Sequence, residues 1–424
     1  MKILLANSPF HGGGITTYCK ELAACLSKDT ELTVVLTNDA KNPINDTNVK
    51  VLYHDTTTLT VKNALFFIDL INNQIRPDVV IVSAATIVSV IIPYLNDHIK
   101  VITISHSGKY FYSDYCAVNH KYIDRIIAAS SDYNKRYLER KFHIHNKDKI
   151  KVIYNFVSGN QELEALRFKK RGQSPISIVF AGGSSIGKAP ELVAKIATAL
   201  LNTNLDFRFY WTGNSNIPLT TTIFKRSKLK RIQQLFPQDE RLIFPGRIPD
   251  KKDFDKLMGS TNIMLAPSKN EGCSMALLEG HRAGSIFIVA DYENSNSEIV
   301  RNGNSGFVIN HKRIDDFVNT IRDIINNHPA YYHLYENSHN TFKTLLSYPV
   351  WKENIFDTLN GETNHKRRKD QISRVGIYLY ILQMKWLHYT SLWNRFLQLS
   401  FPSFLSFCTQ YMKMKRRESV VVRE

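Results

Sequence analysis

Two glutamates separated by seven residues, Glu271 and Glu279, are the side chains whose types and spacing best suit chemistry. They lie in the segment EGCSMALLEG, which follows the apolar run NIMLAP. This order predicts a strand, a loop and then the start of a helix, where free backbone N–H groups favour an anion such as a phosphate. Because Glu279 lies two turns into that helix, both carboxylates can face the same side.

Carboxylates accept hydrogen bonds well from vicinal hydroxyls, so one glutamate could hold a transferred sugar and the other the ribose of a nucleotide. The N–H groups for the phosphates would come from the loop and the first helical residue: Gly272, Cys273, Ser274 and Met275. The plainer interpretation is that Glu271 stabilises the helix dipole and that Glu279 is solvated. The preceding strand and the small residues at the junction favour the functional interpretation.

Short apolar, β-branched runs recur along the chain between stretches with helical periodicity. They span 2–6, 32–36, 78–83, 100–105, 125–130 and 151–155, and then 176–181, 206–211, 241–245, 262–267 and 286–290. Continuous runs are typical of strands that helices cover on both faces of a parallel sheet. The fold class predicted is therefore α/β, with two Rossmann-like domains facing each other across a cleft and the ligand at the carboxyl ends of the strands.

The length of 424 residues also favours two domains over one compact core. We expect a first domain over 1–165, a second over 166–345, a helix or linker returning toward the first domain over 346–370, and a basic aromatic extension over 371–424. The first residues predict a strand and not a signal peptide, and five scattered cysteines predict a reducing, cytoplasmic compartment.

The E-x7-E spacing within EGCSMALLEG resembles the donor-site motif of retaining glycosyltransferases of the GT-B fold, family four. Pro267-Ser268 before it and the segment Ser297-Glu298-Ile299-Val300 after it are also similar to that family. The similarity covers roughly 1–355 and is specific at 262–309. It implies transfer of a hexose-type sugar, with retention, from a nucleotide diphosphate sugar to a glycan or lipid-linked acceptor in cell-surface polysaccharide or glycolipid synthesis.

Three further family signatures can be placed on this sequence. The glycine-rich loop after the first strand contains Gly13 and Gly14, whose N–H groups would approach the donor; alone, such a loop is equally a tight turn. By resemblance, His106 would contact the sugar near the reacting carbon. Lys188 matches the lysine of a basic pair over the diphosphate, where cations stabilise the leaving group. Gly183 stands where the pair's arginine is expected, so either a neighbour such as Arg247 replaces it or the donor site is weakened.

The predicted catalytic residues are thus His106, Lys188 and Glu271. Asp253 and Asp255 form a DxD sequence, which in another glycosyltransferase fold binds a metal. Here they open an apparent helix, so we interpret them as acids at a helix start. We expect no cofactor and no obligatory metal, since the nucleotide sugar is a substrate.

The net charge of +17 is concentrated near the C-terminus, where residues 366–424 hold twelve Lys or Arg and three Asp or Glu, a net +9. Aromatic residues interleave with these bases, which predicts a helix at an anionic membrane surface and a peripheral location on the inner face of the cell membrane. Packing onto the first domain or oligomerisation are the alternatives.

Two other functions are compatible with the sequence. A catalytically inactive GT-B-like scaffold that recruits partners at the membrane would fit Gly183. Nucleic-acid binding would fit the pI of about 9.5, but the chain has no recognisable reader motif, so we expect no nucleic-acid partner.

Overall fold

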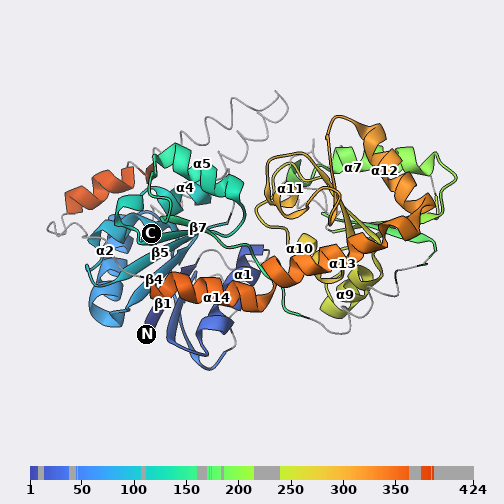
Figure 1. Cartoon of the computed structure of the whole chain (residues 1–424). Coiled ribbons are helices and arrows are strands. Elements are labelled where there is room, and N and C mark those ends of the chain that lie inside the picture. The colour runs from blue at the N-terminus through green and yellow to red at the C-terminus, as the bar shows by residue number, and fades with distance from the viewer. Residues whose placement is uncertain are drawn as a thin grey trace.

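The computed structural model describes residues 1–7, 14–37, 44, 46–106, 111–159, 170, 172, 174–182, 186–213, 239–361, 374–382, 384 and 385. Their strands form two separate sheets, one in each half of the chain (Figure 1). All strand pairs within the two sheets are parallel. The predicted fold class of two Rossmann-like domains is confirmed.

The first sheet has seven strands in the order β3-β2-β1-β4-β5-β6-β7. They are β1 (Lys2–Asn7), β2 (Glu31–Leu36), β3 (Val49–Tyr53), β4 (Val79–Ser83), β5 (Lys100–Ser105), β6 (Arg125–Ala128) and β7 (Ile150–Val152). The chain builds outward from β1 in one direction and from β4 in the other. The carboxyl ends of β1 and β4 are therefore the switch point where such sheets bind ligands.

The second sheet has six strands in the order β10-β9-β8-β11-β12-β13. They are β8 (Ile176–Ala181), β9 (Phe207–Thr212), β10 (Leu242–Gly246), β11 (Ile263–Ala266), β12 (Ile286–Ala290) and β13 (Gly306–Ile309). Its switch point lies between β8 and β11. Lys188 follows the first of these strands and Glu271 follows the second, so this topology brings the two predicted donor residues to one place.

Helices cover both sheets. In the first domain they are α1 (Gly14–Leu26), α2 (Val61–Asp69), α3 (Thr86–Ile91), α4 (Phe111–Ala117) and α5 (Asp132–Phe142). In the second they are α7 (Pro190–Leu201), α9 (Lys251–Ser260), α10 (Met275–Arg282), α11 (Ser295–Ile299), α12 (Ile314–Asn326) and α13 (Tyr332–Thr341). Leu4 belongs to the core on one face of the first sheet and Leu5 to the core on the other. This two-sided burial is why the strands read as continuous apolar runs.

Helix α14 (Tyr348–Asn360) follows the second domain in the chain but packs on the first domain, as Figure 1 shows. Trp351, Ile355 and Leu359 are buried in the same core as β1. The ammonium group of Lys100, at the start of β5, donates to the carbonyl oxygens of Thr358 at 2.8 Å, Leu359 at 2.8 Å and Gly361 at 2.5 Å. A cation at a helix C-terminus satisfies its free carbonyls, so Lys100 fixes α14 to the first sheet.

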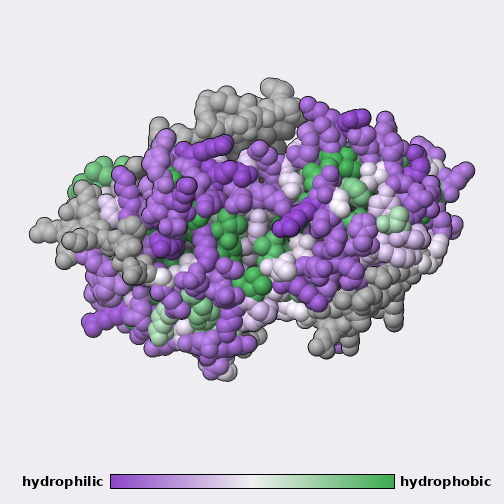
Figure 2. Space-filling view, viewed as in Figure 1, coloured by the Kyte–Doolittle hydropathy of each residue, from purple (hydrophilic) through white to green (hydrophobic). Residues whose placement is uncertain are grey.

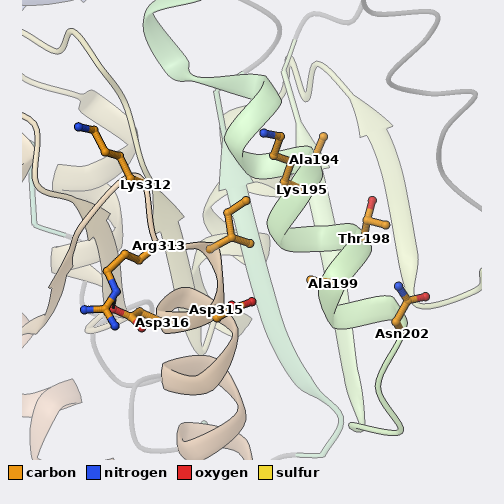
Figure 3. Close-up of a pocket in the computed structure, with 10 residues that line it drawn as sticks. Ala194, Lys195, Thr198, Ala199, Asn202, Lys312, Arg313, Asp315 and Asp316 are labelled. Carbon is orange, nitrogen blue, oxygen red and sulfur yellow. Dashed lines mark ion pairs between the residues drawn. The ribbon is translucent and has the colours of Figure 1, made fainter.

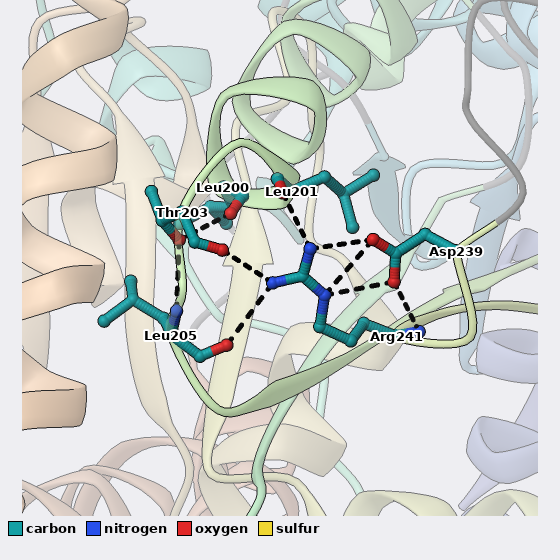
Figure 4. Close-up of polar contacts among 6 residues, drawn as sticks. All are labelled: Leu200, Leu201, Thr203, Leu205, Asp239 and Arg241. Carbon is teal, nitrogen blue, oxygen red and sulfur yellow. Dashed lines mark hydrogen bonds and ion pairs between the residues drawn. The ribbon is translucent and has the colours of Figure 1, made fainter.

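Arg241 has a comparable role at the edge of the second sheet (Figure 4). Its guanidinium donates to Asp239 Oδ2 at 2.7 Å and to the carbonyl oxygens of Leu201 at 2.7 Å and Thr203 at 2.8 Å. Leu201 is the last residue of α7 and Thr203 lies just after it, so one planar side chain joins the C-terminus of α7 to the approach to β10.

Candidate active site

The predicted strand–loop–helix unit around Glu271 is formed by β11 and α10. Ser274 is the N-cap of α10 and has an extended backbone, and its side chain makes no capping hydrogen bond. A Cβ at Gly280 would lie 2.7 Å from Met264 Sδ and 2.8 Å from Phe287 Cζ. Glycine at this position therefore lets α10 pack closely on the sheet, which holds the N-terminus of the helix at the carboxyl end of β11.

Lys188 and Glu271 form an ion pair that joins the loop after β8 to the loop after β11. The carbonyl oxygen of Gly187 also accepts from the N–H groups of Lys269 at 2.8 Å and Asn270 at 3.2 Å. The side chains of the pair are 24% and 12% exposed, so each keeps some surface that a ligand can reach. The structure thus unites two residues that lie 83 positions apart.

Glu279 does not share this pair. Its residue is 8% exposed, and its Oε1 lies 3.0 Å from the ammonium group of Lys251 on α9. Lys251 also pairs with Asp255, whose Oδ1 accepts from Arg282 Nη2 at 2.8 Å. Burial raises the pKa of Glu279, and the charge of Lys251 opposes that rise. The alternative in which Glu279 is simply solvated is therefore wrong.

The network also revises the interpretation of the DxD sequence. Asp250 is the N-cap of α9, with its side chain accepting from the N–H groups of Lys252 and Asp253. Asp253 lies in the first turn, as expected of a helix-start acid, whereas Asp255 is a partner of Lys251 and Arg282. No group of three or more His, Cys, Asp or Glu side chains in the described part of the chain is arranged to hold a metal ion.

His106 directly follows β5 in the first domain. Its Nε2 lies 2.9 Å from Ser83 Oγ, which lies 3.1 Å from Cys19 Sγ. The ring of Tyr18 meets the imidazole edge-on at 5.1 Å between centroids. Burial lowers the pKa of His106 to about 4, so the ring is neutral at pH 7 and acts there as a hydrogen-bonding group and not as a cation.

The remaining predicted residues lie at separate places in the chain. Gly13 and Gly183 lie outside the described residues, and Gly14 is the first residue of α1. In the donor loop, Cys273 is buried, and its carbonyl oxygen lies 3.4 Å from Asn155 Nδ2, on the segment that crosses between the domains. Arg247 is exposed just beyond β10.

An open depression of about 760 Å³ lies elsewhere on the second domain, between α7 and the start of α12 (Figure 3). Its lining includes Lys195, Thr198, Lys312 and Asp315, and no predicted site residue. Because it is formed by the outer faces of two helices and receives nothing from the first domain, it does not match a site for transfer between two substrates.

Known sequence families match both domains. The model described as "Glycosyltransferase Family 4" matches residues 12–160, and the model described as "Glycosyl transferases group 1" matches residues 160–341. Together they span most of the chain, with the second covering the loop and helix of Glu271 and Glu279. No curated protein sequence matches significantly.

Solved structures share the fold over 85% of this chain. HepE from Anabaena, in complex with UDP, has a TM-score of 0.67 at 14% identity, with 99% of its chain covered. Sucrose-phosphate synthase from Thermosynechococcus elongatus has a TM-score of 0.68 at 12% identity, with 98% covered. The lipopolysaccharide outer core galactosyltransferase WaaB has a TM-score of 0.63 at 17% identity, with 99% covered. At these identities the likeness concerns the fold alone.

Proposed function

Since the chain belongs to the family 4 glycosyltransferases of the GT-B fold, we propose that it transfers a hexose-type sugar from a nucleotide diphosphate sugar to a glycan or lipid-linked acceptor with retention. The observation that carries the proposal is the Lys188–Glu271 pair, held in front of α10 at the switch point of the second sheet. A cation, a helix N-terminus and a carboxylate together suit a diphosphate joined to a sugar.

Each side chain then has a distinct task. Lys188 and the first N–H groups of α10 stabilise the charge that develops on the diphosphate as it leaves. Glu271 accepts from hydroxyls of the transferred sugar, and Glu279 from the ribose. Neutral His106 contacts the sugar from the first domain. No cofactor or obligatory metal enters this scheme, because Lys188 and the helix supply the positive potential.

The chemical step has a defined balance of atoms. The bond from the anomeric carbon to the diphosphate oxygen breaks, and the acceptor hydroxyl oxygen forms the new bond on the same face of an oxocarbenium-like sugar. The acceptor proton passes to the leaving phosphate. Proton NMR of the new linkage tests this step, because an inverted product would contradict it.

The first test is a thermal-shift and turnover screen of the full chain against nucleotide diphosphate sugars, starting with UDP-glucose because HepE binds UDP and glucose. A ligand at a hundred times its Kd stabilises the folded state by about 2.7 kcal/mol, which raises the Tm of a domain of 150–250 residues by roughly 5–10 °C. We expect one donor to give this shift and to be consumed. If none does, with or without a divalent metal, the inactive scaffold becomes the better function.

We further propose that the enzyme works at the inner face of the cell membrane, in polysaccharide or glycolipid synthesis, with an anionic lipid surface as partner. Helix 374–382 buries Ile377 and Ile381 in the core of the first domain. Its opposite face exposes four apolar residues at helical spacing: Val375, Tyr378, Leu379 and Leu382. Figure 2 shows this helix as a green patch. Exposed Arg374 and Lys385 flank it, as expected of a helix at a lipid interface.

Flotation with vesicles tests the membrane proposal. Leu379→Glu should weaken binding to vesicles that contain phosphatidylglycerol. The exposed face of helix 374–382 then loses apolar surface and gains a negative charge that the anionic lipids repel. Tyr53→Glu, at an exposed apolar residue on the edge strand β3, is the matched control and should bind as wild type. Two results would count against a lipid partner: equal binding of the two variants to the vesicles, or wild-type protein that binds duplex DNA as well as it binds the vesicles. Among the described residues, no helix is long and apolar enough to span a bilayer.

A further inference from the structure

The carboxylate of Glu298, on the short helix α11 of the second domain, contacts the first domain. We propose that Glu298 is a positioning residue that fixes the orientation of the two domains and thereby the placement of His106 relative to the donor residues. The inference rests on the proposed sugar transfer for its effect on catalysis. The contact of Glu298 with the first domain, which we call the joint between the domains, does not depend on any substrate.

The carboxylate of Glu298 caps α5 from the opposite domain. Its Oε2 accepts from the N–H of Asp132 at 2.9 Å, and its Oε1 accepts from the N–H of Tyr133 at 2.7 Å. These are the first two residues of α5, whose N–H groups have no partner within the helix. The hydroxyl of Tyr154 donates to Oε2 at 3.1 Å, and Arg136 Nη2 lies 3.8 Å from Oε1.

The chemistry of this contact favours a carboxylate over a neutral group. Both oxygens accept charge-assisted hydrogen bonds from adjacent backbone donors, and the helix dipole adds to the attraction. Tyr154 lies on the segment that leaves β7 and crosses to the second domain, so the contact is close to the crossover between the two sheets. Burial raises the pKa of Glu298, while the donors from Tyr133, Tyr154 and Asp132 oppose that rise.

On the second domain, Glu298 is rigidly connected to the donor loop. The side chain of Asn294 caps α11 by accepting from the N–H of Asn296. The amide of Asn294 donates to the carbonyl oxygen of Ser268 at 2.8 Å, and that of Asn296 donates to Ala266 at 3.2 Å. Ala266 ends β11, and Ser268 lies in the loop that carries Glu271.

On the first domain, the same helix end is connected to the segment of His106. The amide of Asn134, in the first turn of α5, donates to the carbonyl oxygen of Ser105 at 3.2 Å and to its hydroxyl at 2.9 Å. Ser105 immediately precedes His106. Hydrogen bonds and the short backbone segments of α11 and α5 between them therefore connect the donor loop, through Glu298, to the residue before His106. Because misplacement of reacting groups by about 1 Å can cost 10²-fold in rate, this joint matters for catalysis.

The test is Glu298→Gln, which keeps the size of the side chain but presents an NH₂ group to one of the two backbone donors. Glu293→Gln, at an exposed glutamate just before α11, is the matched control. Small-angle X-ray scattering of the full chain should show a larger radius of gyration, or a broader distance distribution, for Glu298→Gln only. Its kcat should fall about 10- to 100-fold. The thermal shift given by UDP should stay as in wild type, because the donor residues lie in the second domain.

Two results would overturn the proposal. Scattering and kcat equal to wild type would show that the contact does not fix the domains. A lost UDP shift would place Glu298 in the donor site itself. Tyr154→Phe removes one donor with little risk to folding and should give the same changes to a smaller degree. If wild type consumes no nucleotide sugar, the scattering comparison still tests the joint, so its failure and the failure of the proposed function are distinguishable.

Discussion

Lys188→Ala should lower kcat for sugar transfer about 10²- to 10³-fold, which is the usual cost of removing one preorganised group that stabilises developing negative charge. Lys188, in the loop between β8 and α7, is the cation that forms the ion pair with Glu271. The diphosphate gains charge as the glycosidic bond breaks, so most of the loss should appear in kcat and less in KM. Steady-state kinetics with the donor found in the screen measure both.

Lys195→Ala is the matched control for this experiment. Lys195 is a lysine of the same domain that lines the depression between α7 and α12 (Figure 3). We expect wild-type kinetics from it, and partial rescue from Lys188→Arg, since arginine keeps the charge but has a different shape. Equal losses in Lys188→Ala and Lys195→Ala, or no loss in Lys188→Ala, would contradict the assigned role. The Tm of each variant without ligand shows whether a lost fold explains a lost rate.

Most of the fold could be predicted because burial on both faces makes central parallel strands apolar without interruption. The apolar runs do not predict β3 (Val49–Tyr53), because it is an edge strand in which Lys50 and Tyr53 are exposed and its apolar pattern is not continuous. The strand predicted over 151–155 is too long, since β7 ends at Val152. The apolar residues beyond β7, such as Ile153 and Phe156, are buried against α14 as the chain crosses between the domains.

Contacts between distant segments could not be predicted in the same way. The helical spacing of Lys251 and Asp255 suggests a pair at i and i+4, but nothing local indicates that Glu279 and Arg282 complete it. Family resemblance pointed to Lys188 and Glu271 separately, whereas only the order of strands places them together. The contact of Glu298 with α5 spans 166 positions and leaves no periodic signal.

Glu279→Gln should abolish most of the thermal shift given by UDP and by the donor while leaving the Tm of the free protein near that of wild type. Hydrogen bonds to a charged group contribute about 1.5–3 kcal/mol each, so losing the charge that we propose accepts from the ribose should raise the Kd at least about tenfold. The free energy of unfolding should change little, because Lys251, the partner of Glu279, is 58% exposed and stays hydrated when the carboxylate is neutralised.

Lys251→Met separates the two roles of Glu279, because it removes the cation but keeps the proposed ribose ligand. The carboxylate of Glu279 is then buried without its charged partner, so the Tm of the free protein should fall. The shift given by UDP should persist in Lys251→Met. The reverse pattern, with a retained shift in Glu279→Gln and a lost one in Lys251→Met, would make Lys251 the nucleotide contact and Glu279 its support. Isothermal titration with UDP decides between these outcomes, since it reads the Kd independently of the Tm.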